Sequence, residues 1–310
     1  RSNLWFEINS GELNGSLVSF SEGFKGLIDV NIKKYNDEFV LSLSGSLAEL
    51  DISKMRIDEP GFLRSHISGD INVKFRFGKV KTLDLFTQLN PSTFGNYEIS
   101  RLRMNAKYVD DGKSKKLILQ SNMLDANIEG HFSFGDLFKA LSATFKAIND
   151  EINEKINFAK VGRAHLIGVE NPVDVEYRFK LKNLTPISVF STGQIFQAIG
   201  NVDGNLVADS LGLYLNVEAK LQKLLYLGYK GARIDTFKMG AFNGGFDFKY
   251  EADKLGFRIH LGVGNFASKT FNLRDASLKV NYNGPEIYFE ISASTDIGNV
   301  NLIADGEFSS

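Results

Sequence analysis

The chain contains no cysteine, one tryptophan, five prolines and four histidines among its 310 residues. Without cysteine there can be no disulfide framework, iron–sulfur cluster, thiolate zinc site or thiol nucleophile. No apolar run approaches the roughly 20 residues that a transmembrane helix needs. Both ends of the sequence show a pattern typical of β-strands, so we expect the chain to be part of a longer protein. We expect no cofactor and no metal.

Neither sign of charge is in excess, because 36 Lys and Arg residues oppose 37 Asp and Glu residues. Proteins that bind nucleic acid neutralise phosphates with clustered basic residues, and the sequence has no basic block of that kind. We therefore expect no nucleic-acid partner. Hydrophobic residues make up 43% of the chain, enough for the core of one large domain or two medium ones.

Phenylalanine dominates the aromatic residues, with 26 Phe against 10 Tyr and 1 Trp. Tyr and Trp prevail where a ring must face both water and an apolar phase, whereas Phe has no polar group. Much of the aromatic surface is therefore expected to be dry or to contact an apolar ligand.

Catalytic signatures are absent from the sequence. The histidines His66, His131, His165 and His260 have no second histidine or acid at metal-ligand spacing. His131 and His260 alternate out of phase with their apolar neighbours, so we expect both to face water. No nucleophile elbow, phosphate-binding loop or zinc-protease motif is present, and we expect the protein not to be an enzyme.

Alternation with a period of two is the main pattern along the chain. Ile28, Val30 and Ile32, for example, are separated by Asp29 and Asn31. Roughly 18 to 20 such segments are separated by Gly, Asn and Asp turns, as expected for antiparallel hairpins. The pattern predicts a mostly β fold with an antiparallel sheet that is apolar on one face, and it excludes architectures in which helices and strands alternate.

A glycine recurs inside the strands in the pattern apolar, polar, Gly, any residue, apolar, as in Leu43-Ser-Gly45-Ser-Leu47. Each glycine shares a face with its apolar neighbours, where the missing side chain leaves a notch and lets the strand bend. We expect the sheet to curl at these points. The alternative is that each glycine only avoids a side chain where the core is crowded. The irregular spacing of the motif favours a meander over a fixed-period solenoid. The seven glycines are Gly15, Gly45, Gly69, Gly130, Gly204, Gly244 and Gly306.

One amphipathic helix is expected from Asp136 to about Asn157. Leu137 and Leu141 begin a series of apolar residues at spacings of three and four, and Ser133 with Asp136 resembles a capping box. We expect this helix to pack over the open end of the sheet and to cap or gate it.

The helix divides the chain into three expected segments. They are a first β segment at 1–134, the helix insertion at 135–160 and a second β segment at 161–310. Shorter helical turns are expected at Leu83–Leu89 and Pro186–Phe190.

The stretch 117–134, with sequence LILQSNMLDANIEGHFSF, is followed directly by the expected helix. It resembles a recurring signature of the TamB family of translocation and assembly module proteins, in its Bacteroidota-type members, within the AsmA-like group of bridge-like lipid transfer proteins. That signature is a strand ending in Ser, a small-acidic-small turn, a strand with Gly and alternating aromatics, and a helix. The chain lacks the membrane anchor and the carboxy-terminal domain of the family, so it is expected to be a middle part of such a protein.

The resemblance implies a long curled antiparallel sheet with an open hydrophobic groove, called a β-taco. It implies a periplasmic bridge between the inner and outer membranes that carries phospholipid acyl chains and supports outer-membrane biogenesis and protein assembly. The implied partners are a TamA-like assembly-factor barrel in the outer membrane and the inner membrane, reached through an anchor outside this chain. The apolar positions expected to line the groove are Ile28, Val30, Ile32, Leu41, Leu43, Ile71, Val73, Phe75, Ile128, Phe132, Phe134, Leu213, Leu215, Val217, Phe246, Phe248, Phe257, Ile259, Leu261, Leu278, Val280, Ile287, Phe289 and Ile291.

Two other interpretations of the same pattern stay open. The strands of an outer-membrane β-barrel also alternate, although a barrel has Tyr and Trp girdles that this composition does not supply. The third interpretation is an extracellular β-rich adhesin or structural scaffold with an ordinary packed core.

Overall fold

The structure is a computed structural model. It describes residues 2–54, 65–94, 97–156, 169–192, 194–230, 233–251, 254–268, 272–284, 286–295 and 298–307.

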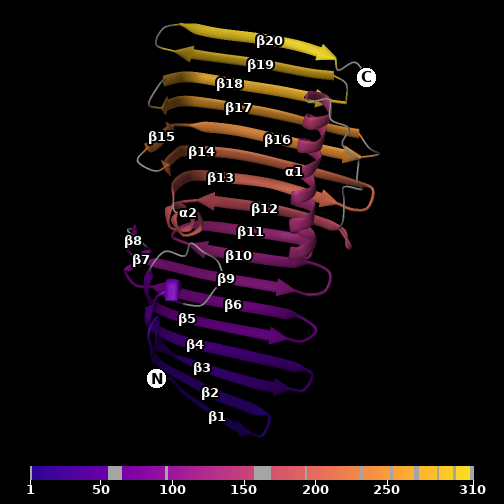
Figure 1. Ribbon diagram of the computed structural model, residues 1–310. Coiled ribbons are helices and arrows are strands. Elements are labelled where there is room, and N and C mark those ends of the chain that lie inside the picture. The colour runs from indigo at the N-terminus through magenta and orange to yellow at the C-terminus, as the bar shows by residue number, and fades with distance from the viewer. Residues whose placement is uncertain are drawn as a thin grey trace. The chain divides into compact units, whose positions relative to one another are not determined.

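The described residues form a mostly β fold of twenty strands, two α-helices and one 3-10 turn at Ile52–Lys54, and all the strand pairings are antiparallel (Figure 1). The predicted fold class is confirmed. No helix in the described part of the chain is long and apolar enough to span a membrane. The strands are β1 (Ser2–Asn9), β2 (Glu12–Ser21), β3 (Phe24–Tyr35), β4 (Glu38–Leu50), β5 (Ser65–Phe77), β6 (Lys81–Leu89), β7 (Ser92–Phe94), β8 (Tyr97–Ile99), β9 (Leu102–Asp110), β10 (Lys115–Ser121), β11 (Leu124–His131), β12 (Val173–Leu181), β13 (Ile195–Ala208), β14 (Gly212–Lys230), β15 (Arg233–Met239), β16 (Phe242–Glu251), β17 (Lys254–Ser268), β18 (Asn272–Asn283), β19 (Glu286–Thr295) and β20 (Asn299–Glu307). The helices are α1 (Phe134–Ile156) and α2 (Thr185–Thr192).

The chain divides into two compact units. Unit 1 comprises Arg1–Asn127 and Lys182–Gln194, and unit 2 comprises Ile128–Leu181 and Ile195–Ser310. The two units are groups of residues that contact one another more than they contact the rest of the chain. The three segments expected from the sequence were instead defined by the position of the helix. Helix α1 belongs entirely to unit 2.

In unit 1, eight strands pair in the order β1-β2-β3-β4-β5-β6-β9-β10. The short strands β7 and β8 pair with each other beside the start of β5. Helix α2 contains the expected turn at Pro186–Phe190, which is confirmed. The Asn183 side chain caps it by accepting the Thr185 N–H at 3.2 Å.

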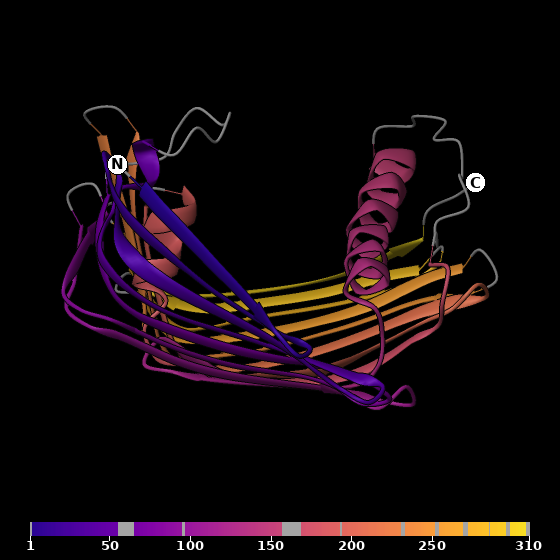
Figure 2. The ribbon, with the colours of Figure 1, turned by 90° about the horizontal axis from the view of Figure 1, so that it is seen from below.

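In unit 2, strands pair in the order β12-β13-β14-β16-β17-β18-β19-β20. Strand β14 is 19 residues long, and its two halves pair with different partners, β16 along the first and β15 along the second. The register of β13 with β14 shifts between Ile199 and Gly200. Such a bulge bends a strand, and the strands of unit 2 are curved in Figure 2.

Helix α1 crosses the strands of unit 2 on one face of the sheet and packs against its core (Figure 1). The capping or gating role expected from the sequence stays a prediction. Ala140, Thr144 and Ala147 are at most 4% exposed and lie on the buried side of the helix. Small residues on that side let the helix approach the sheet closely. The side chains beneath it form the core of unit 2, which includes Phe132, Val173, Val175, Leu206, Leu213, Leu215, Phe248, Leu255 and Tyr282.

The helical turn expected at Leu83–Leu89 is wrong, because these residues belong to strand β6. The apolar residues of this segment occur at spacings compatible with either structure. Pairing with β5 on one side and β9 on the other stabilises the strand. Tertiary pairing overrides the local pattern here.

The expected bend glycines differ in their surroundings. Gly130 has φ +148, and an added Cβ would lie 2.0 Å from the carbonyl oxygen of Asp174 on β12. At Gly15 and Gly204 an aromatic ring of the paired strand lies where the Cβ would be, from Phe6 and Tyr177 respectively. Rings therefore fill two of the notches, as aromatic side chains do over glycines in sheets.

We expect Gly130→Ala to lower the free energy of unfolding by about 1–3 kcal/mol, because the backbone conformation is unfavourable for an L-residue and the partner strand leaves no room. Urea unfolding followed by circular dichroism measures the change. Gly306→Ala is the matched control, since no atom lies within 4 Å of its added Cβ. Equal stability of the two variants would contradict the close approach of β12 to Gly130.

Candidate functional site

The sheet of unit 1 has one apolar and one polar face. Ile32 pairs with Leu41, Leu41 with Phe75 and Phe75 with Leu83, so these side chains share a face. The opposite face carries Ser42, Ser44, Asn72, Lys74 and Asp84, among others. The apolar face of unit 1 consists of Leu13, Leu17, Ile28, Val30, Ile32, Leu41, Leu43, Leu47, Ile71, Val73, Phe75, Leu83, Leu85, Ala106, Tyr108, Leu117 and Leu119.

The sheet of unit 2 repeats this arrangement. Val217 pairs with Phe246, Phe246 with Ile259 and Ile259 with Val280. His260 lies on the polar face and is exposed, as expected, and so is His131. The apolar face of unit 2 consists of Val175, Tyr177, Phe179, Val202, Leu206, Leu213, Leu215, Val217, Phe246, Phe248, Tyr250, Leu255, Phe257, Ile259, Leu261, Leu278, Val280, Tyr282, Ile287, Phe289 and Ile291.

Helix α1 covers one part of the apolar face of unit 2 and leaves the rest open. Beneath the helix, Phe248 and Phe132 are 1% exposed, and Leu213 and Leu215 are at most 4% exposed. These four residues were expected to line a groove, and the structure corrects that expectation by placing them in the core. Away from the helix, side chains such as Ile259 are only half-buried.

Two other expected groove residues lie next to α1. Phe134 is the first residue of the helix, not a strand residue, and is 45% exposed. Ile128 is half-buried and packs against the core beneath the helix. The sequence pattern continued without a break from strand to helix, so alternation alone could not place this boundary.

The outer side of α1 is also apolar. Phe138 and Phe145 are each 69% exposed and lie about 20° apart around the helix axis, opposite the buried alanines. This helix therefore has apolar residues on two sides, a small-residue side against the sheet and a phenylalanine side directed away from it.

Several residues of the apolar face of unit 1 were missed from the sequence. Their alternation is present, but it was interpreted as helical at Leu83–Leu89 and was not assigned to the groove elsewhere. The missed residues are Leu13, Leu17, Leu47, Leu83, Leu85, Ala106, Tyr108, Leu117 and Leu119.

A hollow of about 610 Å³ lies on the polar face of unit 1. Lys74, Asp84, Asn105 and Lys107 are among its lining side chains, and Phe86 lies in its middle strand. Phe86 and Ile118 also line it, so the hollow is mixed in character, and it lies on the side of the sheet opposite the apolar face.

Asp136 anchors the start of α1 to the chain just before β12. Its carboxylate accepts hydrogen bonds from the Ser133 hydroxyl at 2.7 Å, the Asn171 amide at 3.1 Å and the Glu170 N–H at 3.1 Å. These donors lower the pKa of Asp136 to about 2, with Ser133 the largest cause. The Lys139 ammonium lies 3.9 Å away and donates to Glu170. The expected role of Ser133 as cap is confirmed, since its hydroxyl also accepts the Asp136 N–H.

The stretch 117–134 contains a turn that is stabilised by Lys182, a residue far from it in the sequence. The Ser121 hydroxyl accepts the N–H groups of Met123 and Leu124 at 3.1 and 2.9 Å. The Lys182 ammonium donates to the Ser121 carbonyl at 2.8 Å and to Asp125 at 2.6 Å. The Ser and Asp of this stretch therefore hold the β10–β11 turn in place.

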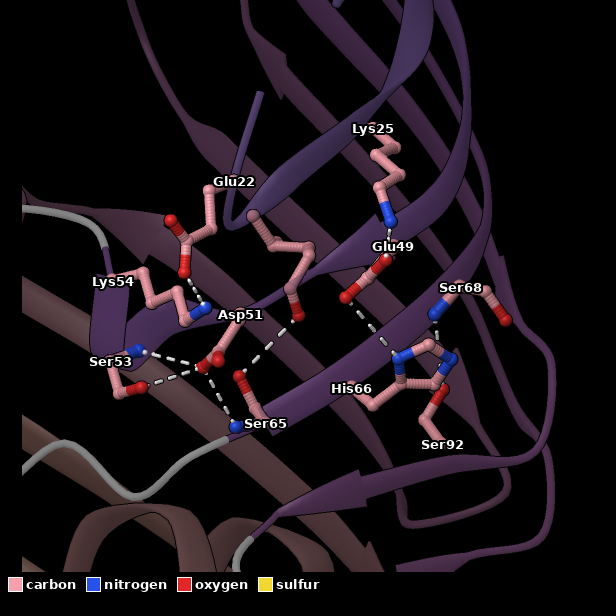
Figure 3. A network of polar contacts seen from close by, with 11 residues as sticks. Glu22, Lys25, Glu49, Asp51, Ser53, Lys54, Ser65, His66, Ser68 and Ser92 are labelled. Atoms are coloured by element: carbon pink, nitrogen blue, oxygen red, sulfur yellow. Dashed lines mark hydrogen bonds and ion pairs between the residues drawn. The ribbon is translucent and has the colours of Figure 1, made fainter. Parts of the chain in front are cut away.

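A polar network joins the ends of β4 and β5 in unit 1 (Figure 3). The Asp51 carboxylate is 4% exposed and accepts the Ser65 N–H at 3.0 Å and the Ser53 hydroxyl at 2.7 Å. The Ser65 N–H is the largest cause that lowers the pKa of Asp51. The carboxylate thus fixes the residues on either side of the segment 55–64.

His66 lies at the edge of this network (Figure 3). His66 Nδ1 lies 4.0 Å from Glu49, which is paired with Lys25, and the Ser92 hydroxyl donates to the Asn90 carbonyl at 2.8 Å. These contacts join neighbouring segments. In the described part of the chain, no three His, Asp or Glu side chains are grouped as a metal site.

The fold and the site together define a mostly β protein whose sheets carry an open apolar face backed by a polar one. Comparison of the chain with protein-family models, curated proteins and solved structures finds no match.

We expect Asp136→Asn to lower the thermal midpoint near neutral pH, because the amide offers fewer acceptor sites and no charge. The folded pKa of about 2 lies below the ordinary value of 3.8, so the stabilisation is complete above pH 3.8 and is lost as pH falls through 2. The difference from the wild type should therefore shrink below about pH 4. Asp203→Asn, at an exposed carboxylate of the polar face, is the control. A difference that does not change with pH would contradict the anchoring role of the charge.

Proposed function

We propose that this chain is a segment of a bridge that carries phospholipid between two membranes, with the acyl chains lying on the apolar faces. The observation that carries the proposal is the half-buried state of those faces. Each unit has eight paired strands, and most of their apolar side chains are covered by no other described element of the same unit. In unit 1, Ile99 of β8 packs over one end of the face, against Ile67 and Leu89. In unit 2, α1 covers one part of the face. Large exposed apolar surfaces of this kind mark binding sites for apolar partners.

The energetics support transport of lipid along such a surface. Exposing roughly 30 methylenes of a two-tailed lipid to water costs about 24 kcal/mol, at about 0.8 kcal/mol per methylene. An apolar face removes most of that cost at every position along the sheet. Seven spacings of about 4.8 Å across eight strands give each unit an apolar path of roughly 34 Å.

Successive strands present similar side chains to the ligand. Along unit 2 the same row contains Val217, Phe246, Ile259, Val280 and Phe289. No strand in this row offers a much larger apolar surface than the next, so a hydrocarbon tail meets no deep energy minimum. The arrangement favours sliding over storage.

The resemblance of the stretch 117–134 to the TamB family supplies the cellular setting of the proposal. The segment would lie in the periplasm of a Gram-negative bacterium and support outer-membrane biogenesis. An anchor outside this chain would connect it to the inner membrane, and a TamA-like assembly factor would receive it at the outer membrane.

A structural scaffold is the second candidate function. The packed core beneath α1 favours it, because Leu206 and Thr144 are fully buried there as in an ordinary globular domain. A scaffold of this kind is soluble without bound lipid, and the two functions therefore differ in one measurement, the phospholipid content of the purified protein.

We expect Ile259→Asp to reduce bound phospholipid strongly, because a carboxylate against acyl chains costs several kcal/mol. Mass spectrometry of the purified full chain counts the lipids. Asn281→Asp is the matched control, since Asn281 lies on the polar face of the neighbouring strand and pairs with Arg258. Circular dichroism confirms that both variants fold. Purified wild-type protein without phospholipid would refute the proposed function.

Photo-crosslinking tests which part of the apolar face is accessible to lipid. Crosslinkers at Ile259 and Phe289 should capture phospholipid in cells, because both side chains are half-buried on the open part. A crosslinker at Phe248 should capture protein only, since Phe248 is 1% exposed beneath α1. Capture of lipid at Phe248 would mean that the helix leaves the sheet. Absence of captured lipid at all three positions would count against lipid carriage.

A further inference from the structure

One rim of the apolar face of unit 1 is lined with lysines. The outermost apolar row of this face is Ile32, Leu41, Phe75, Leu83, Tyr108 and Leu117. Two residues further along each strand, toward the hairpin turns, the side chain returns to the same face. The row at that position is Lys34, Phe39, Phe77, Lys81, Asp110 and Lys115.

The aromatic members of this row lie among the cations. Phe39 and Phe77 pair with each other and are 47% and 44% exposed. The Lys34 ammonium lies 5.7 Å from the centre of the Phe39 ring. An ammonium group over an aromatic ring is attracted to the ring face, and the aliphatic stem of the lysine covers apolar surface beside it while its charge stays in water.

Asp110 is the only acidic residue of this row, and its carboxylate stabilises the β9–β10 turn. It pairs in register with both Lys81 and Lys115, and its carboxylate accepts the Gly112 N–H at 2.9 Å. Three lysines against one aspartate leave the rim positive. With about 4.8 Å per strand, the lysines are spaced by roughly 14 and 10 Å along the rim.

The opposite rim of the same face carries no charge among the described side chains that register places there. Its members are Ser19, Gly26, Leu47, Gly69, Leu89 and Leu102. Lys54 and Lys182 lie near this end of the strands, but each is paired with a carboxylate, Glu22 and Asp125 respectively. The apolar face of unit 1 is therefore asymmetric in charge, with three lysines to one aspartate along one edge and matched ion pairs near the other.

We propose that the lysine rim, defined as Lys34, Lys81 and Lys115, binds the phosphate of phospholipid headgroups and favours anionic over zwitterionic phospholipids. The inference rests on the proposed function, because it takes the acyl chains to lie on the adjoining apolar face. The long aliphatic stems of the lysines cover the last apolar row, and their ammonium groups reach the water where a headgroup lies. Each lipid is thereby oriented with its headgroup at this rim and its tails toward the uncharged one.

The test uses the full chain incubated with vesicles of equal phosphatidylglycerol and phosphatidylcholine content. The protein is then separated from the vesicles, and its bound lipids are counted by mass spectrometry. We expect wild-type protein to be enriched about fivefold in phosphatidylglycerol for each lysine engaged, and the enrichment to fall with added salt. The triple variant K34Q/K81Q/K115Q should keep its total lipid and lose the enrichment, and K34R/K81R/K115R should retain both.

The control K74Q/K107Q/K220Q removes three lysines from the polar faces and should leave total lipid and enrichment unchanged. Wild-type protein that binds both lipids equally, or a glutamine rim variant that keeps its enrichment, would overturn the inference while leaving lipid carriage intact. Wild-type protein that binds no lipid would overturn the proposed function as well.

Discussion

The pleat of a β-strand directs successive side chains to opposite faces, and in each unit the eight long described strands form a single layer of sheet. Every strand therefore has an apolar side that needs cover and a polar side that does not. A sandwich covers the apolar side with a second sheet. Here α1 covers one part of it in unit 2, and the remainder stays half-buried.

The cover over unit 2 depends on small residues. Ala140 and Ala147 bring the helix close enough to bury Phe248 and Leu206 completely, which gives this unit a true core. Asp136 then fixes the first turn of the helix to the chain before β12 through two hydrogen bonds, and a third joins it to the cap residue Ser133. The stable part of the unit and its open apolar part are thus adjacent regions of one face, separated by the edge of the helix.

Alternation in the sequence was sufficient to predict the fold class and most of the residues that share the apolar faces. Ile28, Val30 and Ile32 needed no tertiary information, because a period of two permits only one arrangement. The burial of Phe248 could not be foreseen, since it depends on where α1 lies. Segment Leu83–Leu89 was misassigned because short apolar runs fit both helix and strand until their partners are known. The lysine rim emerges only from register, which places residues from the ends of three hairpins in one row.

Nearly every strand pairs with the strand that precedes it in the chain, so most interactions join residues that are close in sequence. Stability in such a meander approaches a sum of nearest-neighbour terms, as in repeat proteins. A defect in one hairpin then loosens that hairpin and its two neighbours, while distant hairpins keep their pairing. Cooperativity along each sheet is consequently short-ranged, and damage stays local instead of melting the whole unit.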